Sequence, residues 1–239
     1  MQEYWLERTE LLLGADAIER LRNSHVLVVG LGGVGAYAAE MLCRAGIGQM
    51  TIVDADHIHP SNRNRQLIAL KSTEGKSKAQ LMQERLLDIN PEIELHVVEE
   101  FIRDESVFKI LETPFDYIVD AIDTLVPKMY LIETALERKI PIISSMGSGG
   151  KMDPSQIQIT DFSKTYNDKL ARMLRKRMHK LGIRDGFKVV FSPEQTKKEA
   201  VVFVENEENK KTTVGTISYM PPLFGSFMAA EIIREIIGG

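Results

Sequence analysis

The segment from Val26 to Gly35 constrains the fold of this chain more than any other. Val26-Leu27-Val28-Val29 predicts a buried strand, and Gly30-Leu31-Gly32-Gly33-Val34-Gly35 predicts a tight turn that leads into a helix. Glycines at such a turn let backbone N–H groups approach a phosphate, and the helix N-terminus adds a favourable potential for the anion. Asp54 ends the next predicted strand, at about the distance where an acidic side chain usually holds a ribose hydroxyl.

Strand and helix patterns alternate through the first two thirds of the chain. Strands are predicted at 26–29, 50–53, 94–98, 117–121 and 140–144, and helices at 34–45, 76–89, 105–111 and 127–138. This rhythm predicts an α/β, Rossmann-like, doubly wound and mostly parallel sheet with helices on both faces. The tail differs, because predicted strands at 157–160, 189–191 and 214–219 surround a basic helix, which indicates an antiparallel C-terminal extension.

We expect residues 1–150 to form a nucleotide-binding core and residues 151–239 to form an extension packed on it, within a single domain overall. Residues 194–211 are charged and are predicted to form a mobile loop or a hairpin.

Composition restricts the location and the partners. The formal net charge of −4 gives no global attraction to nucleic acid, so such binding would need a local patch. The single cysteine excludes an intramolecular disulfide and favours a reducing compartment. Charges and Pro221-Pro222 interrupt the apolar stretch 216–237, so no membrane span is expected. These features predict a cytoplasmic protein without a membrane partner.

Cations after Asp54 favour ATP over a nicotinamide cofactor. A triphosphate that is about to be cleaved needs positive charge, which Arg65 and Lys78 can supply. Either residue alone is more simply explained as a solvated surface cation, but both follow the ribose aspartate at the same predicted sheet edge. Asp123, after a later strand, could cap the next helix or hold Mg²⁺ beside the phosphates. The candidate nucleotide-binding residues are Gly30, Gly32, Gly33, Gly35, Asp54, Asp56, Ser61, Asn62, Asn64, Arg65, Gln66, Lys78, Asp123 and Thr124.

These motifs resemble the family of ubiquitin-activating enzymes and bacterial adenylyltransferases of sulfur-carrier proteins. That family shares a GxGGxG turn, a strand-end Asp, an S-N-x-x-R-Q stretch, a helix Lys and a later Asp. The resemblance implies that Asp54 holds ribose, that Asn62, Arg65 and Lys78 hold phosphates, and that Asp123 lies near Mg²⁺. It also implies a homodimer in which Arg8 reaches the phosphates of the partner subunit. The implied catalytic residues are Arg8, Arg65, Lys78 and Asp123.

The cysteine content separates the branches of that family. Sulfur-carrier enzymes usually carry two Cys-x-x-Cys pairs that bind zinc, and this chain has only Cys43, within a predicted helix. A cysteine in that position is usually a small buried hydrophobe, so thiol-based conjugation and structural zinc are disfavoured.

Three further stretches resemble a more specific branch, the tRNA threonylcarbamoyladenosine dehydratases. They are 62–70 (NRNRQLIAL), 120–128 (DAIDTLVPK) and 147–157 (GSGGKMDPSQI), and the likeness extends from about residue 8 to 227. The hydrophobic C-terminal anchor that some members carry is missing. This branch implies ATP-dependent cyclisation of the threonylcarbamoyl group on an adenosine beside the tRNA anticodon.

The residues suit that chemistry. Attack of a carboxylate on the α-phosphate gives an acyl adenylate, and a nitrogen or oxygen of the same substituent can then attack the activated carbonyl. Such intramolecular reactions have effective molarities on the order of 10⁵ M or more. No protein nucleophile is needed, so positioning and charge neutralisation would supply most of the rate.

A basic run provides a candidate tRNA surface. From 164 to 184 there are eight cations and a single acid, Asp168. Such a run usually marks a solvated helix face, but its imbalance within an acidic protein favours tRNA contact. The predicted nucleic-acid-binding residues are Lys164, Lys169, Arg172, Arg175, Lys176, Arg177 and Lys180, with Arg184 beyond them.

Three other functions stay open at this point. The first is an adenylyltransferase that acts on the C-terminus of a small sulfur-carrier protein, which would need a protein ending in Gly-Gly for pyrophosphate exchange. The second is an ATP-binding adaptor without catalysis, and the third is a nicotinamide dehydrogenase.

Overall fold

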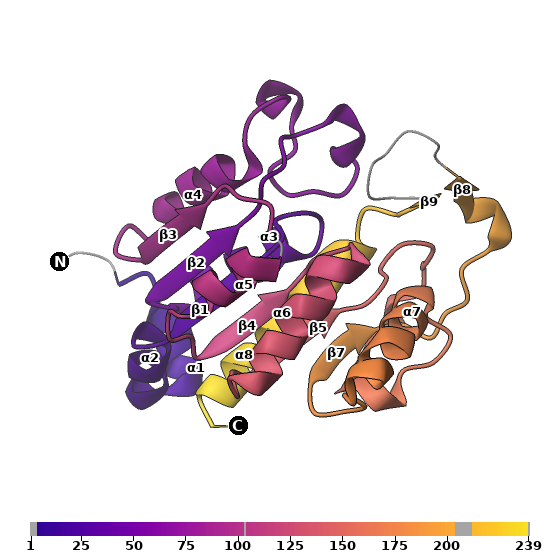
Figure 1. The fold of residues 1–239 in the computed structure, drawn as a ribbon. Helices are drawn as coiled ribbons and strands as arrows, with labels where there is room; N and C mark the ends of the chain where they lie inside the picture. Colours follow the sequence, from indigo (N-terminus) through magenta and orange to yellow (C-terminus); the bar gives the residue numbers. More distant parts are fainter. Residues whose placement is uncertain (1–3, 103, 204–211, 239) are drawn as a thin grey trace.

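The computed structural model describes residues 4–102, 104–203 and 212–238 of the chain. Seven strands form one sheet in the order β3-β2-β1-β4-β5-β7-β6 (Figure 1), and every neighbouring pair is parallel except β6 and β7. The strands are β1 (His25–Val29), β2 (Gln49–Val53), β3 (Glu94–Val98), β4 (Tyr117–Asp120), β5 (Ile142–Ser145), β6 (Gln158–Asp161) and β7 (Lys188–Phe191). The predicted α/β, Rossmann-like, mostly parallel architecture is therefore confirmed.

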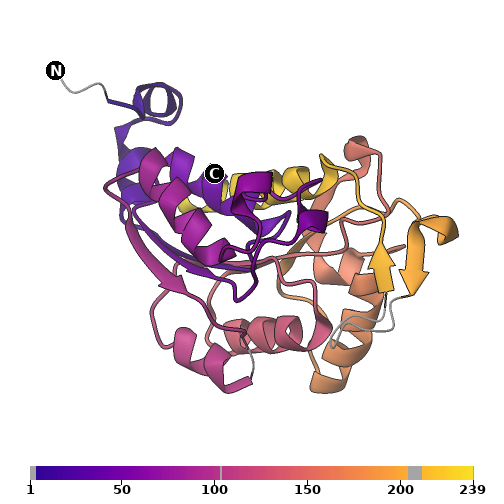
Figure 2. The ribbon, with the colours of Figure 1, turned by 90° about the horizontal axis from the view of Figure 1, so that it is seen from above.

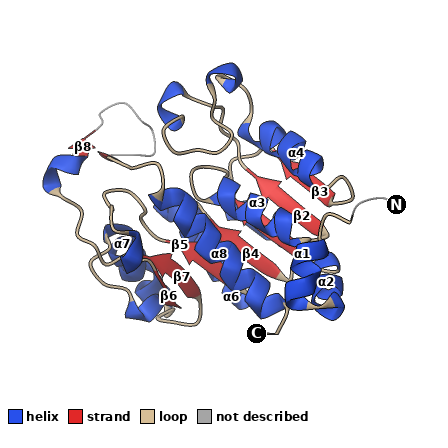
Figure 3. Ribbon diagram, turned by 180° about the vertical axis from the view of Figure 1, so that it is seen from behind, coloured by secondary structure: helices blue, strands red, loops and turns tan. Residues whose placement is uncertain are grey.

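Helices cover both faces of the sheet (Figure 3). One apolar core lies beneath α2, α3, α4 and α8, and a second lies beneath α5, α6 and α7. The bounds are α2 (Ala15–Arg22), α3 (Gly35–Ala45), α4 (Lys78–Ile89), α5 (Asp104–Ile110), α6 (Leu125–Glu137), α7 (Lys169–Met178) and α8 (Met220–Ile236). All five residues of β1 are buried, because this central strand has helices on both sides.

An N-terminal helix that the sequence pattern did not predict, α1 (Glu7–Leu13), precedes α2. None of its residues is buried, and Leu11 and Leu12 are each 81% exposed. Figure 2 shows α1 projecting away from the sheet and its covering helices. Only its last residue, Leu13, packs partly against the core, so this short helix has no apolar stripe that hydrophobic periodicity could reveal.

The C-terminal part confirms the antiparallel extension and corrects one strand. β6 pairs antiparallel with β7, and β8 (Val201–Phe203) pairs antiparallel with β9 (Thr212–Val214). The strand predicted at 214–219 is wrong: β9 ends at Val214, and the Thr216 hydroxyl donates to the Val214 carbonyl just beyond it. A mobile loop or a hairpin was predicted for 194–211. β8 lies in this range and pairs with β9 just after it, while residues 204–211 lie outside the described residues.

Residues 151–239 add β6 and β7 to the same sheet as residues 1–150, and α8 packs against α3. A boundary near residue 150 stays a prediction. None of the helices within the described residues has the length and apolar composition needed to cross a bilayer.

Candidate nucleotide site at the carboxyl edge of the sheet

The chain reverses direction across the sheet between β1 and β4. From β1 it proceeds to β2 and β3 on one side, and from β4 it proceeds to β5 and β7 on the other. In open α/β sheets a ligand crevice lies beyond the carboxyl ends of the two strands at such a point. Here the residues that follow β1 form the glycine turn 30–35, and those that follow β4 form the segment 121–124.

Three of the four glycines in this turn are required by close contacts within the protein. Gly30 has a φ of 90°, and a Cβ built there would lie 2.8 Å from the Ala121 carbonyl oxygen. A Cβ at Gly35 would lie 1.7 Å from the Gly30 carbonyl oxygen, and one at Gly33 would lie 2.9 Å from Cβ of Pro221. These values lie below any real Cβ contact, so a side chain at these positions would displace the backbone or α8.

Gly32 is different. A Cβ there would meet only the Gln66 amide nitrogen, at 3.7 Å, which is an ordinary contact. The protein therefore leaves room for a side chain at Gly32. A backbone that stays uncovered at this point can be approached closely by a phosphate group, which is the arrangement that a nucleotide site needs.

Asp54 joins the glycine turn to β2. One carboxylate oxygen accepts the Leu31 N–H at 2.6 Å, and the other accepts the Asp56 N–H at 2.8 Å. Burial raises the pKa of Asp54, while Lys78 and these two N–H groups act in the opposite direction. Each carboxylate oxygen has a second lone pair, so Asp54 can hold the turn and still accept a ribose hydroxyl.

Lys78 begins α4 and lies in the same cluster of charges. Its side chain is 6% exposed, and its Nζ lies 2.7 Å from a carboxylate oxygen of Asp56, which is 66% exposed. The backbone N–H of Lys78 also donates to the Asp56 carbonyl. Lys78 is thus a buried cation whose acidic partner faces solvent, so an anion can approach it from the open side.

Arg65 lies directly against the glycine turn, because a Cβ at Gly33 would be 3.4 Å from its Cγ. Its guanidinium donates to the Ser61 carbonyl at 3.0 Å and to the Asn64 side-chain oxygen at 2.8 Å. The Asn64 amide in turn donates to the Thr216 carbonyl at 2.9 Å. Arg65 is therefore held beside the glycine turn by two local acceptors, neither of which carries a net charge.

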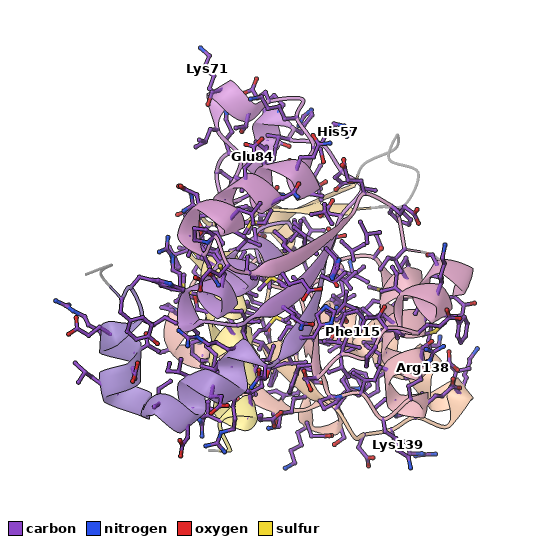
Figure 4. All side chains as sticks on the ribbon, turned by 90° about the vertical axis from the view of Figure 1, so that its left-hand side faces the viewer. His57, Lys71, Glu84, Phe115, Arg138 and Lys139 are labelled. Carbon is purple, nitrogen blue, oxygen red and sulfur yellow. The ribbon has the colours of Figure 1, made fainter. Side chains whose placement is uncertain are left out.

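The rest of the S-N-x-x-R-Q stretch forms a structured loop. The Asn62 side-chain oxygen accepts the His59 N–H at 3.0 Å, and the His59 ring lies 2.8 Å from the Ser61 hydroxyl. His57, which Figure 4 labels at the top of the molecule, forms an isolated bridge to Ser77. Gln66 is buried beside Gly32, and its side-chain oxygen is the one buried polar side-chain atom without a hydrogen-bond partner among the described residues.

The β4 side of the crevice is built on a charge pair that sequence reasoning missed. Asp120 and Lys128 are each 0% exposed, and their charged atoms lie 2.8 Å apart. Asp120 also accepts the Ser144 hydroxyl at 2.7 Å, and Lys128 donates to the Ile122 carbonyl at 2.9 Å. Asp123 is exposed and directly follows Ile122, whose carbonyl accepts the Lys128 ammonium. Thr124 is the N-cap residue of α6.

Lys151 is a second residue that the sequence analysis did not single out, and it is 3% exposed. Its Nζ donates to the carbonyl oxygens of Ser192, at 2.9 Å, and Glu194. Burial lowers the pKa of Lys151, although Asp168 and Glu194 oppose the shift. Lys151 thus ties the loop after β5 to the loop after β7, and nothing in its local sequence distinguishes it from a surface lysine.

Arg8 is not brought to this crevice. It lies on α1, which precedes α2, and α2 leads into the amino end of β1. The carboxyl edge that carries the glycine turn is at the other end of the strands (Figure 1). Within one chain, Arg8 is therefore separated from the other predicted catalytic residues by the length of the sheet.

Cys43 behaves as the sequence predicts. It is buried in α3, its Sγ lies 3.5 Å from the Leu86 carbonyl, and burial raises the pKa of its thiol to about 12. It therefore stays protonated at neutral pH and is no nucleophile. Among the described residues no group of three or more His, Cys, Asp or Glu side chains could hold a metal ion by itself.

The basic run is mostly solvent-exposed. Arg175 is the exception: it is half-buried, donates to the Thr165 carbonyl at 2.7 Å, and lies over the Phe162 ring at 5.9 Å. These contacts within the protein explain the position of Arg175 without a nucleic acid. The one acid of the run, Asp168, is 4% exposed and caps α7 through the Ala171 N–H. The exposed charged side chains of the run are therefore all cations, namely Lys164, Lys169, Arg172, Lys176, Arg177, Lys180 and Arg184.

Comparisons with known proteins agree with this geometry. A tRNA threonylcarbamoyladenosine dehydratase of Bacillus subtilis is 39% identical over 96% of this chain and 93% of its own length. A crystal structure of the Escherichia coli tRNA N6-threonylcarbamoyladenosine dehydratase in complex with ATP superimposes with a TM-score of 0.90. That protein is 34% identical, and the match covers 99% of this chain and 96% of the other. The sulfur carrier protein ThiS adenylyltransferase of E. coli is 30% identical over 59% of this chain, a more distant similarity. The family model described as ThiF matches residues 6–239, and this chain therefore belongs to the ThiF family.

Proposed function

We propose that this chain is an ATP-dependent tRNA threonylcarbamoyladenosine dehydratase. The observation that carries the proposal is that three groups meet at the glycine turn: the uncovered backbone of Gly32, Arg65 beside Gly33, and Lys78 beside Asp54, which holds the turn through Leu31. Relatives of that name cover nearly the whole chain, and one of them was crystallised with ATP. ATP fits the crevice because its phosphates match both the glycine turn and the cations.

The proposed reaction has two steps, and each bond that forms is matched by a bond that breaks. A carboxylate oxygen of the threonylcarbamoyl group attacks the α-phosphorus of ATP, and pyrophosphate leaves. A nitrogen or oxygen of the same substituent then attacks the activated carbonyl, and AMP leaves with the former carboxylate oxygen. The nucleoside loses one water while ATP becomes AMP and pyrophosphate, which is the balance of a cyclising ligase.

The chain's own residues supply binding and charge. Asp54 accepts the ribose hydroxyls while it holds the turn through Leu31, and Arg65 and Lys78 stabilise the negative charge that grows on the phosphates. Asn62, Asn64 and Gln66 line the same loop. No side chain acts as a nucleophile, which agrees with the protonated thiol of Cys43.

Magnesium fits the site only together with the triphosphate. Mg²⁺ in such sites takes one or two carboxylates and completes its shell with phosphate oxygens and water. Asp123, exposed at the end of β4, offers such a carboxylate beside the glycine turn. Mg²⁺ bound there would neutralise phosphate charge during displacement of pyrophosphate.

The active assembly is a homodimer. Helix α1 projects from the molecule and exposes Leu11 and Leu12, two leucines that a second copy can cover. Arg8 on the same helix would then reach the phosphates of the partner subunit, since it is far from those of its own. The tRNA would lie on the exposed cations of the basic run, in the cytoplasm where tRNA is modified.

A direct assay tests the function. The protein is incubated with ATP, Mg²⁺ and threonylcarbamoylated tRNA, and the nucleosides are analysed by mass spectrometry. The expected result is a nucleoside that has lost one water, with one AMP formed for each. AMP formation without the dehydrated nucleoside would overturn the substrate assignment, and the absence of both would overturn the proposal.

The sulfur-carrier adenylyltransferase is the second candidate. The same crevice could activate a protein C-terminus, and that activity predicts pyrophosphate exchange that depends on a small protein ending in Gly-Gly. Exchange that requires tRNA and ignores such a protein supports the dehydratase.

A further inference from the structure

An exposed aromatic side chain lies beside the basic run. Tyr166 is 52% exposed, and its ring packs only edge-on against Phe191, with centroids 5.7 Å apart and ring planes inclined at 71°. Phe191 is fully buried and is the last residue of β7. The Tyr166 ring is thus supported from below by the core, and much of its surface faces solvent.

The backbone around Tyr166 is fixed on both sides. The preceding carbonyl, of Thr165, accepts the Arg175 guanidinium at 2.7 Å, and the Thr165 hydroxyl bonds the Phe162 carbonyl at 2.8 Å. The following residue, Asn167, has a φ of 56°, which reverses the chain direction. Asp168 then caps α7 and also accepts the backbone N–H of Gly147. A ring held in this way loses little conformational freedom when a ligand stacks on it.

The electrostatic surroundings favour an anionic ligand. Lys164, Lys169 and Arg172 are exposed on the same loop and the first turn of α7. The one acid between residues 162 and 184 is Asp168, which is 4% exposed and engaged by backbone N–H groups. A half-exposed aromatic ring whose own loop and following helix carry cations and no exposed acid is a combination that binds unpaired nucleotides, because bases stack on the ring and phosphates pair with the cations.

The position agrees with the proposed reaction. Phe191 and the Gly147 loop both lie at the carboxyl ends of their strands, the edge that carries the nucleotide crevice. In the order β1-β4-β5-β7, about two and a half strand spacings separate the crevice from β7, which is on the order of 12 Å. A modified nucleoside whose side chain reaches the crevice would leave the bases of its own loop near Tyr166.

We propose that Tyr166 is a stacking platform for an unpaired base of the tRNA anticodon loop, and that it orients the loop on the basic surface. This inference rests on the proposed dehydratase function and extends it from a charged surface to a defined base contact. The occupant is a single-stranded nucleotide, because a paired base does not present its face. The hydroxyl of Tyr166 is not required, since stacking uses the ring.

Three variants and one RNA probe test the platform. The probe is a fluorescently labelled anticodon stem-loop that carries threonylcarbamoyladenosine, and its dissociation constant is measured by anisotropy. Tyr166→Phe is expected to bind like the unaltered protein, whereas Tyr166→Ala is expected to bind about tenfold to a hundredfold more weakly. Phe108→Ala removes a ring that is similarly exposed, at 45%, on α5, and is expected to change nothing. The ATP affinity and thermal midpoint of each variant report whether the fold is intact.

A second probe series separates stacking from other losses. Each unpaired position of the loop, apart from the modified adenosine, is replaced in turn by an abasic nucleotide. At the stacked position the abasic RNA should bind the unaltered protein and Tyr166→Ala equally, because the contact is already absent. If Tyr166 instead stacks on the adenosine that carries the modification, none of these abasic substitutions removes the contact. Tyr166→Ala then binds every abasic RNA more weakly than the unaltered protein does, whether or not the adenosine is modified.

The tests of Tyr166 can fail independently of the test of the dehydratase function. Equal affinities for Tyr166→Ala and Tyr166→Phe would overturn the platform, even where the unaltered protein dehydrates its tRNA. Failure of the unaltered protein to form the dehydrated nucleoside would overturn the function, which the assay above detects without any Tyr166 variant. A rise in KM for tRNA with an unchanged KM for ATP in Tyr166→Ala would support both.

Discussion

At the scale of single residues, the crevice depends on two kinds of cation. Among the described residues, the Arg65 guanidinium donates to two neutral acceptors, on Ser61 and Asn64, and we propose that its charge serves the phosphates. Lys128 is fully buried against Asp120 and acts on the fold. The two residues are both positive and both adjacent to the site, yet their removal should have different consequences.

Arg65→Ala should abolish most activity and leave the fold intact. The guanidinium would no longer stabilise charge that develops on the phosphates, and loss of one such donor typically lowers turnover about 10²- to 10³-fold. Steady-state AMP release with saturating tRNA measures the loss. Arg63→Ala is the matched control, because Arg63 is exposed nearby and pairs with Glu74 at 3.2 Å. Similar activities for the two variants would contradict a phosphate role for Arg65.

Lys128→Met should destabilise the protein. It leaves the Asp120 carboxylate buried without its cation, and breaking a buried pair in this way costs about 3–5 kcal/mol. Urea-induced unfolding gives the free energy of unfolding. Lys188→Met is the control, because Lys188 is 41% exposed and its partners Glu235 and Glu231 are 34% and 12% exposed, so water reaches the charge and a smaller loss is expected. Equal losses in the two variants would argue against a structural role for the buried pair.

At the scale of elements, α8 supports the glycine turn from behind. Gly225 lies where α8 crosses α3, and a Cβ built there would lie 2.3 Å from the Val34 carbonyl oxygen and 3.0 Å from the Ala38 nitrogen. Val34 is the N-cap of α3, directly after the glycine turn. The last helix of the chain therefore packs directly on the start of α3, next to the glycine turn that is proposed to bind phosphate.

Gly225→Ala should separate α8 from α3 and weaken ATP binding as well. Overpacking of this kind costs about 1–3 kcal/mol, and the displaced backbone belongs to the start of α3. Thermal unfolding and calorimetric titration with ATP measure the two effects. Ser226→Ala is the control, since the Ser226 hydroxyl bonds only the Pro222 carbonyl within α8. A Gly225→Ala protein with unchanged stability would show that the helices can move apart without cost.

At the scale of the whole molecule, His25 at the amino edge of the sheet makes the free energy of unfolding depend on pH. Burial lowers the pKa of His25, the neighbouring His96 lowers it further, and Glu94 and Asp116 oppose the shift. The ring lies 2.9 Å from the Thr51 hydroxyl and packs edge-on against Phe115, which Figure 4 shows far from His57. The folded protein therefore prefers neutral His25.

The sign of the pH effect follows from that preference. Between the lowered folded pKa and the unfolded value of 6.5, the unfolded chain binds more protons at this position than the folded one. Stability from His25 is therefore fully present above pH 6.5 and is lost as the pH falls through the folded pKa. The free energy of unfolding should drop less between pH 7.5 and 5.5 in His25→Gln than in the unaltered protein. His179→Gln, on the exposed turn after α7, should keep the full drop.

Much of the fold followed from local pattern. The strand, glycine turn and helix at 26–45 were predicted within one residue of their bounds, because apolar runs and glycines act over a few residues. Helices α1, α2 and α8 were not predicted; α1 has no fully buried residue and so no apolar stripe. The strand at 214–219 was wrong because β9 ends at Val214. The site residues Asp54, Arg65 and Lys78 remain predictions that the ATP and tRNA assays test.

The sequence by itself determined the alternation of strands and helices from β1 to β5, the glycine turn, and which acids and cations follow the strands. Only the tertiary structure decided which groups meet across long separations in the chain. Two examples are the hydrogen bonds that Lys151 donates to the Ser192 carbonyl and that the Asn64 amide donates to the Thr216 carbonyl. Such contacts depend on the relative placement of packed layers, and the residues that make them carry no periodicity or spacing of their own.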